Sequence, residues 1–193
     1  VYPGETLGLV GESGCGKSTV GNVIMKLHKR TDGEMYLDGK DVFASDADKN
    51  EFCRKVQIIF QDPYSSLNPR KTIKDILSEP LLVQKLFSKG PELDKFINNL
   101  CDAVGLSKDL LNRYPHELDG GMRQVVGIAR ALSLNPSFIV CDEPVSSLDV
   151  SVQAKIINLL MDLQKQRNLS YLFISHDLSV VRHISNRIAV MYL

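Results

Sequence analysis

The sequence lacks the features of membrane-spanning, disulfide-rich and nucleic-acid-binding proteins. No apolar run approaches the roughly 20 residues of a membrane helix, and no stretch resembles a signal peptide, so we expect membrane association to be peripheral or through a partner. The four cysteines show no C-x-x-C spacing, which favours free thiols in a reducing cytosol over disulfides or a metal site. Lys plus Arg and Asp plus Glu both total 23, and this zero formal net charge gives no support for nonspecific nucleic-acid binding.

The chain does have enough length and apolar content for a folded unit. Its 193 residues suffice for one large domain or a domain with a subdomain, and a hydrophobic content of 44% can supply a sizeable core. There is no internal repeat and no low-complexity tract.

The most informative stretch fits the phosphate-binding loop G-x-x-x-x-G-K-[ST]. It consists of Gly11, Glu12, Ser13, Gly14, Cys15, Gly16, Lys17, Ser18 and Thr19. Apolar residues before it predict a strand at 6–10, and those after it predict a helix at 17–28. Glycines let backbone N–H groups face phosphate oxygens, and the helix N-terminus adds partial positive charge. We expect Lys17 to reach the β- and γ-phosphates and the Ser18 hydroxyl to bind Mg²⁺. This loop alone leaves a kinase, a GTPase, a motor and a transporter ATPase open.

The rest of the chain alternates predicted strands and helices, which indicates an α/β fold with a mainly parallel sheet. Asp38-Gly39 after the short run 35–37 predicts a hairpin and a small antiparallel part. We predict a single domain in which 1–71 and 117–193 form the α/β core and 72–116 form an inserted helical subdomain. Because the loop lies so close to the start and an apolar strand (188–193) ends the chain, we expect an N- and C-terminally truncated fragment. Further strands are predicted at 56–60, 138–141 and 171–174, and helices at 123–132 and 152–163.

Polar side chains follow three of these strands, at the edge where open α/β sheets bind ligands. Asp142 and Glu143 follow the run 138–141, and we expect Asp142 to bind Mg²⁺ through water and Glu143 to polarise the water that attacks the γ-phosphate. Gln61 follows another strand, where an amide can sense γ-phosphate, Mg²⁺ or the attacking water. His176 follows the last of the three and could hydrogen-bond the γ-phosphate. The alternatives are a solvated carboxylate pair, a surface glutamine and a capping or core histidine.

A Gly120-Gly121 pair opens the predicted helix at 123–132. Backbone amides at such a helix start could bind a second anion. The alternative is an ordinary helix start in which Asp119 is the N-cap residue.

The order of these motifs resembles that of the ATP-binding-cassette (ABC) ATPases. The family's motifs appear in their usual order over nearly the whole chain. They are a phosphate loop, a Q-loop Gln61, a signature motif at 118–122, the pair Asp142 and Glu143, a D-loop at 147–149 and a switch His176. The amino-acid sequences of segments 60–70, 143–153 and 176–181 resemble those of the oligopeptide, dipeptide and nickel importer ATPases.

The resemblance implies an ATP- and Mg²⁺-dependent ATPase that powers transport of peptides or nickel. Two ATPase subunits, identical or paralogous, would enclose two ATP molecules head to tail, with Ser18, Gln61 and Asp142 around the metal. The subunit would sit peripherally on the cytoplasmic face of the cell membrane. It would contact permease subunits through Gln61 and the segments 62–70 and 72–90, and a solute-binding protein indirectly. Residues acting on the partner's ATP would be Asp119, Gly120, Gly121, Met122 and Asp149.

Two residues depart from the family's usual Leu-Ser-Gly-Gly-Gln signature. Asp119 stands in place of serine and Met122 in place of glutamine, while Val125 stands where this branch usually has arginine. A carboxylate cannot donate a hydrogen bond to phosphate, and repulsion at about 4 Å is worth on the order of 1 to 4 kcal/mol. We hypothesise that this subunit lends a weakened signature to its partner's site. A rival explanation is that Asp119 is simply a better helix cap.

The resemblance leaves some features open. The family stacks adenine on an aromatic residue ahead of the phosphate loop, and Tyr2 is too close to Gly11 for that role, so we predict a turn residue there. Alternatives to an importer are an accessory ATPase of carbon–phosphorus lyase and a weakly hydrolysing, nucleotide-gated clamp. A DNA-repair clamp is disfavoured because long coiled-coil inserts are lacking.

Overall fold

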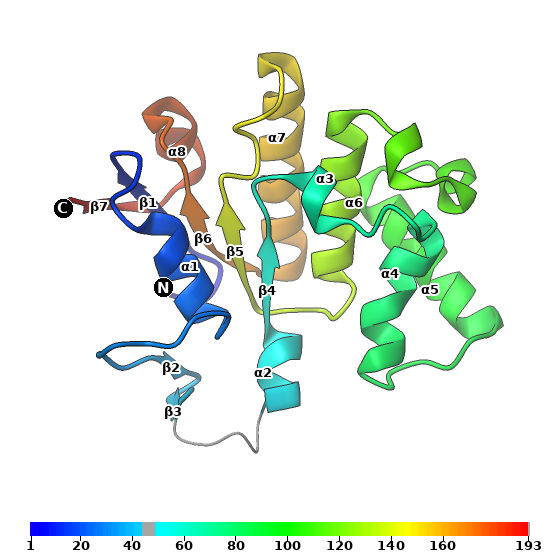
Figure 1. The fold of residues 1–193 in the computed structure, drawn as a ribbon, viewed down its shortest axis with the longest axis horizontal. Coiled ribbons are helices and arrows are strands. Elements are labelled where there is room, and N and C mark those ends of the chain that lie inside the picture. Colours follow the sequence, from blue (N-terminus) through cyan, green and yellow to red (C-terminus); the bar gives the residue numbers. More distant parts are fainter. Residues whose placement is uncertain (44–48, 193) are drawn as a thin grey trace.

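The computed structural model describes residues 1–43 and 49–192 and is built around one parallel sheet (Figure 1). The five strands of this sheet follow the order β4–β5–β6–β1–β7, and each neighbouring pair is parallel. The sheet and a separate hairpin contain the strands β1 (Thr6–Gly11), β2 (Tyr36–Leu37), β3 (Lys40–Asp41), β4 (Val56–Ile59), β5 (Phe138–Asp142), β6 (Ser170–Ile174) and β7 (Arg187–Met191). The helices are α1 (Lys17–Ile24), α2 (Lys49–Lys55), α3 (Pro63–Ser66), α4 (Ile73–Val83), α5 (Pro91–Val104), α6 (Gly120–Leu132), α7 (Val150–Arg167) and α8 (Leu178–Ile184).

Both faces of the sheet are covered, which explains why its central strands are continuous apolar runs. In β5, Ile139 and Cys141 face the larger core, which includes residues of α6, α7 and α8, while Val140 faces the other way. In the same way Tyr171 and Phe173 of β6 join the larger core, and its remaining apolar residues pack toward α1. The alternation expected of a strand therefore separates two apolar layers, and the α/β fold predicted from sequence is confirmed.

The segment 72–116 is helical, as its spacing of apolar residues predicts. It contains α4, α5 and the 3₁₀ turns Lys108–Asn112 and Pro115–Glu117. A capping box opens α4, in which the Thr72 hydroxyl accepts from the Asp75 amide and the Asp75 carboxylate accepts from Thr72. In Figure 1 this segment lies beside α6, at the end of the molecule away from β1. That residues 72–116 form a separate helical subdomain stays a prediction.

The predicted hairpin is present, and its turn has the expected backbone. Strands β2 and β3 pair antiparallel around Asp38 and Gly39, whose φ angles are 51° and 76°. Two consecutive residues with positive φ are the requirement of the tight turn that joins two strands. The turn predicted at Tyr2 is also present, because its carbonyl accepts the Glu5 amide at 3.1 Å.

One boundary prediction was wrong, because the first helix ends at Ile24 and not at 28. Lys26 adopts a left-handed conformation with a φ of 57°. Its amide bonds to the Val23 carbonyl at 3.0 Å, and the Leu27 amide bonds to the Asn22 carbonyl at 2.8 Å. This pair of bonds is a Schellman motif, which stops a helix even where apolar residues continue. The last residue of the strand predicted at 188–193, Leu193, lies outside the described residues.

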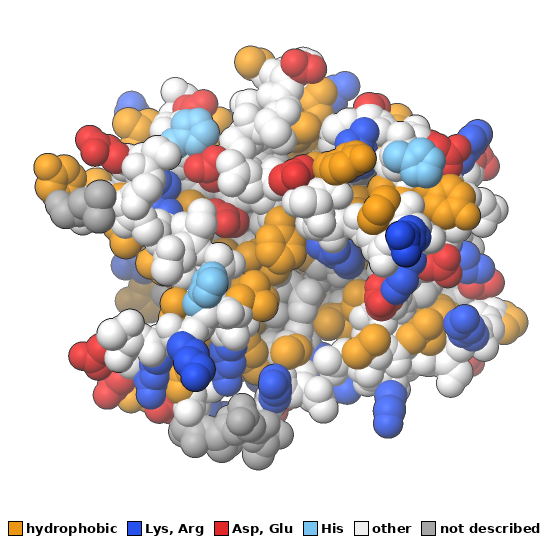
Figure 2. Space-filling model, in the orientation of Figure 1, with side chains coloured by type: hydrophobic (Ala, Val, Ile, Leu, Met, Phe, Trp, Pro, Cys, Tyr) orange, Lys and Arg blue, Asp and Glu red, His pale blue; other side chains and the backbone are white. Residues whose placement is uncertain are grey.

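The surface carries charges of both signs. Figure 2 shows acidic and basic side chains mixed across the visible face, in the view of Figure 1. Across residues 1–43 and 49–192, no helix combines the length and apolar character required to cross a bilayer.

Candidate nucleotide-binding site

The loop between β1 and α1 leaves a helix N-terminus open. Gly14 and Gly16 have φ angles of 85° and 100°, which non-glycine residues rarely adopt. The N-cap residue of α1 is Gly16, which has no side chain that could cap the helix. The first amides of α1 are therefore available to an anion, as the phosphate-loop pattern predicts.

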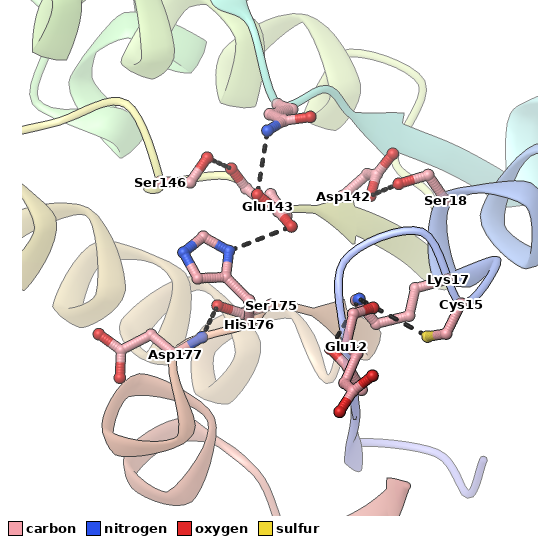
Figure 3. Close-up of polar contacts among 12 residues, drawn as sticks. Glu12, Cys15, Lys17, Ser18, Asp142, Glu143, Ser146, Ser175, His176 and Asp177 are labelled. Atoms are coloured by element: carbon pink, nitrogen blue, oxygen red, sulfur yellow. Dashed lines mark hydrogen bonds and ion pairs between the residues drawn. The ribbon is translucent and has the colours of Figure 1, made fainter. Parts of the chain in front are cut away.

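Lys17 is the buried cation of this loop. Its Nζ donates to the carbonyls of Gly11 at 2.9 Å and Glu12 at 2.8 Å, and it lies 3.7 Å from the thiol of Cys15 (Figure 3). Carbonyls neutralise an ammonium group only in part, since they carry no net charge. The site therefore has positive charge available for a phosphate.

Ser18 and Asp142 join the loop to the end of β5. The Ser18 hydroxyl donates to Asp142 Oδ1 at 2.9 Å. Burial raises the pKa of the Asp142 carboxyl, and the hydrogen bond from Ser18 opposes this shift. A hydroxyl next to a carboxylate is an oxygen donor set of the kind that Mg²⁺ prefers.

Glu143 is the centre of the polar contacts at this edge of the sheet. Its Oε2 accepts from Gln61 Nε2 at 3.0 Å, and its Oε1 lies 3.2 Å from His176 Nδ1. Figure 3 shows the His176 ring directed at this carboxylate, with Asp142 and Ser18 on its other side. Carboxylate, amide and imidazole therefore converge on one place from the ends of β5, β4 and β6.

The backbone of Glu143 is unusual, with a φ of 46° for a residue that carries a Cβ. The amide and hydroxyl of Ser146 both donate to the Glu143 carbonyl, at 3.3 Å and 3.1 Å, and the Glu143 amide donates to Ile174 at 3.0 Å. Strained backbone of this kind persists where the surroundings fix it, and it is concentrated at functional sites. These bonds hold the carboxylate toward its neighbours.

These side chains line one open cleft of about 520 Å³. This volume is within the range of ligand pockets in proteins. Free helix amides, a buried ammonium group and paired oxygen donors fit a triphosphate with its magnesium ion. The lining consists of Ser13, Gly14, Gly16, Lys17, Ser18, Thr19, Gln61, Glu143 and His176.

A second cluster lies at the starts of α6 and α7, and none of its members lines the described cleft. Asp119 is the N-cap residue of α6, because its Oδ1 accepts from the Met122 amide at 2.7 Å. A Cβ on Gly121 would lie 2.7 Å from Val152 Cγ1, so the glycine lets α6 pack closely on α7. Asp149 is the exposed N-cap residue of α7.

The structure therefore divides the predicted site residues into two groups. Residues of the phosphate loop line the cleft with Gln61, Glu143 and His176, and Asp142 joins them through Ser18, whereas the signature residues and Asp149 form the other group. Sequence reasoning missed Ser146 and the positive φ of Glu143. A glutamate gives no sequence signal for a positive φ, so this conformation could not be predicted. The only available signal was a serine three residues after Glu143, which can bond back to its carbonyl.

A phosphate loop next to strand-end carboxylates, at the carboxyl edge of a parallel sheet, defines a nucleoside-triphosphate-binding protein of the phosphate-loop class. The sequence pattern of the family described as "ABC transporter" matches residues 1–146. The chain belongs to this family, which confirms the resemblance drawn from the motifs.

Relatives in the same family include transport proteins of known name. The chain is 55% identical to the oligopeptide transport ATP-binding protein OppF of Bacillus subtilis, over 100% of this chain and 64% of the relative. It is 50% identical to the dipeptide transport ATP-binding protein DppF of Escherichia coli, over 98% of this chain and 57% of the relative. The chain thus spans about three-fifths of the length of these relatives.

Solved structures show the same fold. A dimeric ATP-binding cassette in a post-hydrolysis state, bound to ADP and Pi, matches with a TM-score of 0.84 and 31% identity, over 99% of this chain and 82% of that chain. CbiO1 from Clostridium perfringens, part of the ABC transporter complex CbiONQ, matches with a TM-score of 0.85 and 26% identity, over 99% and 74%.

Proposed function

We propose that this chain is the ATP-binding and ATP-hydrolysing part of a subunit that powers peptide import. The observation that carries the proposal is the position of Glu143, held between Gln61 and His176 in the cleft that Lys17 and Ser18 also line. This position supports an acid–base role for the Glu143 carboxylate, because the cleft also contains the phosphate-binding loop.

Each residue has a role that follows from its position. The open N-terminus of α1 and the Lys17 ammonium group bind the phosphates, and Ser18 and Asp142 hold the metal. Bound ATP with Mg²⁺ supplies the phosphoanhydride bond and the charge neutralisation that phosphoryl transfer requires. Glu143 accepts a hydrogen bond from the attacking water and orients it. The Gln61 amide and the His176 imidazole keep this carboxylate in place through their contacts with its two oxygens.

The relatives support the partners and the location that we propose. A solved cassette with the same fold is a dimer with ADP and Pi, and we propose that this subunit also dimerises when it binds ATP. Oligopeptide and dipeptide transport proteins are 50% to 55% identical to the chain, which supports a peptide rather than nickel as the transported solute. The subunit would then bind permease subunits at the cytoplasmic face of the membrane, with a solute-binding protein as an indirect partner.

Substitution of Glu143 by glutamine tests the proposed chemistry. Glutamine preserves the shape but cannot accept a proton, so we expect turnover to fall by about 10² to 10⁴-fold while ATP binding and ATP-dependent dimerisation persist. Glu92→Gln is the matched control, because Glu92 is exposed in the first turn of α5. ATPase rates, equilibrium ATP binding and sedimentation of the full-length subunit are the measurements. Equal, low turnover in wild type and Glu143→Gln would contradict hydrolysis and support the nucleotide-gated clamp.

A second experiment separates the importer from an accessory ATPase of carbon–phosphorus lyase. The full-length subunit is purified from native membranes with its partners, and the partners are identified by mass spectrometry. Permease subunits in the complex support the importer. Soluble phosphonate-metabolism proteins in their place would overturn it.

A further inference from the structure

Two arginines on one face of α6 hold the segment that carries Gln61. Arg123 and Arg130 are seven residues apart, so their side chains emerge on the same side of the helix. In Figure 1, α3 lies against α6, and this short helix begins two residues after Gln61. Both arginines contact the segment 60–66.

The segment needs such support because α3 has only four residues. A helix of one turn is not stable by itself in water. Its N-terminus is capped by Asp62, whose Oδ1 accepts the Tyr64 amide at 2.8 Å, and this bond lowers the pKa of the Asp62 carboxyl. The Gln61 side chain is exposed, so its position on Glu143 depends on a fixed backbone.

Arg130 binds both ends of this segment. Its Nη1 donates to the Ser66 carbonyl at 2.5 Å, and its guanidinium carbon lies 6.0 Å from the centre of the Phe60 ring. Burial lowers the pKa of Arg130, and the negative charge of Glu79 opposes this shift, although no carboxylate of the described residues lies within 4.0 Å of the guanidinium group. Placing a cation in a partly buried position without a carboxylate in contact costs folding free energy, and the hydrogen bond to the Ser66 carbonyl offsets part of this cost.

Arg123 joins the same segment to the start of α6. Its Nε and Nη2 both donate to the Leu118 carbonyl, at 2.9 Å and 2.7 Å, and its guanidinium carbon lies 5.2 Å from the centre of the Tyr64 ring. Leu118 directly precedes the Asp119 cap. One side chain therefore contacts both the Gln61 segment and the signature segment.

We infer that Arg123 and Arg130 are positioning residues for the hydrolysis proposed above. Arg130 fixes the backbone on either side of Gln61, so that the amide stays on Glu143. Arg123 couples this segment to the Leu118 carbonyl, so that a displacement of Gln61 by a ligand also displaces the signature segment 118–122. The inference rests on the proposed function for its kinetic consequence but not for its contacts.

The kinetic test uses the full-length subunit with its partners and a double-mutant cycle. We expect Arg130→Met to lower kcat by about tenfold, with KM and equilibrium ATP affinity within about twofold of wild type, because only orientation is lost. Arg130→Lys should recover part of the rate. In a Gln61→Ala background, Arg130→Met should cause no further loss, because both changes remove the same contact. An equal loss of kcat in both backgrounds would overturn the inference.

A matched control separates positioning from general stability. Arg54 also joins two parts of the chain, since its Nε and Nη2 donate to Oε1 and the carbonyl of Gln84, both at 3.0 Å. Its hydrogen bonds among the described residues go to Gln84 and not to the segment 60–66. We expect Arg54→Met to lower the Tm while leaving kcat within about twofold of wild type. A tenfold loss of kcat in Arg54→Met would show that the arginines act through stability alone.

Amide hydrogen exchange tests the contacts without any turnover. Arg130→Met should accelerate exchange in the segment 60–66 only, whereas Arg123→Met should accelerate it in both 62–66 and 118–122. Faster exchange in 118–122 with Arg130→Met, or unchanged exchange there with Arg123→Met, would overturn the proposed division of roles. A wild-type subunit that neither binds nor hydrolyses ATP would instead contradict the proposed function, and the exchange result would still decide this inference.

Discussion

Two helices of this protein have glycines at their N-terminal ends, Gly16 at α1 and Gly120-Gly121 at α6, but the two N-termini are capped differently. Helix α1 follows Gly16 and has no side-chain cap, with the Lys17 ammonium group beside it. Helix α6 follows Asp119, whose carboxylate already accepts the Met122 amide. The dipole of a helix N-terminus attracts negative charge; at α1 this end is open to phosphate, whereas at α6 it already faces a carboxylate of its own chain.

The comparison shows that glycines alone do not define an anion site. Gly16 is required by its left-handed backbone, whereas Gly121 is required by the close packing of α6 on α7. The second requirement is structural and holds whether or not a phosphate ever approaches. The chemistry of the signature segment therefore depends on Asp119 and Met122, and the latter is 42% exposed.

The largest expected effect is a loss of ATP binding at the uncapped N-terminus of α1. Lys17→Ala removes the only lysine or arginine side chain that lines the described cleft. Charge-assisted hydrogen bonds to phosphate are worth about 1.5 to 3 kcal/mol each, so we expect ATP affinity to fall by about 100-fold. Lys29→Ala, at an exposed position after α1, is the control. Calorimetry measures the affinity, and a loss of less than about threefold would show that the loop does not bind the phosphates.

Much of the cleft around the phosphate loop was predictable from sequence, because parallel strands bring their carboxyl ends to one edge of the sheet. Apolar runs located β4, β5 and β6, and the polar residue after each run gave Gln61, Glu143 and His176. The early end of α1 was not predictable, since a left-handed lysine has no sequence signal. The arginine contacts with α3 were equally hidden, because they join Arg130 to Ser66 across 64 residues of chain.

The second prediction tests whether the glycines of the signature segment are there for packing. Gly121→Ala should lower the free energy of unfolding by about 1 to 2 kcal/mol, because the new Cβ would meet Val152, a β-branched side chain with little freedom to move. Gly120→Ala is the matched control, since its Cβ would lie 3.3 Å from the end of a flexible leucine, Leu148. We expect it to stay within about 0.5 kcal/mol of wild type. Urea unfolding of the two variants decides, and equal stabilities would contradict the packing explanation.

The smallest effect on stability, and the most informative one for function, concerns Asp119. Asp119→Ala removes the cap of α6 and should cost about 1 kcal/mol of unfolding free energy, whereas Asn and Ser both preserve the capping oxygen and should cost only a few tenths. These three variants therefore separate the cap from the charge.

The same variants decide whether Asp119 weakens the binding of a partner's ATP by the signature segment. The full-length subunit is measured in a Glu143→Gln background, so that ATP-dependent dimerisation can be followed by sedimentation without turnover. If the carboxylate repels a bound triphosphate, both Asp119→Asn and Asp119→Ser should tighten the dimer by about tenfold, since about 1.4 kcal/mol of repulsion is relieved. Tightening by serine alone would show that the missing hydroxyl donor matters more than the charge. If neither variant changes the affinity of the dimer, the hypothesis is wrong and Asp119 acts only as a helix cap. A capping role alone is compatible with a partner identical to this chain.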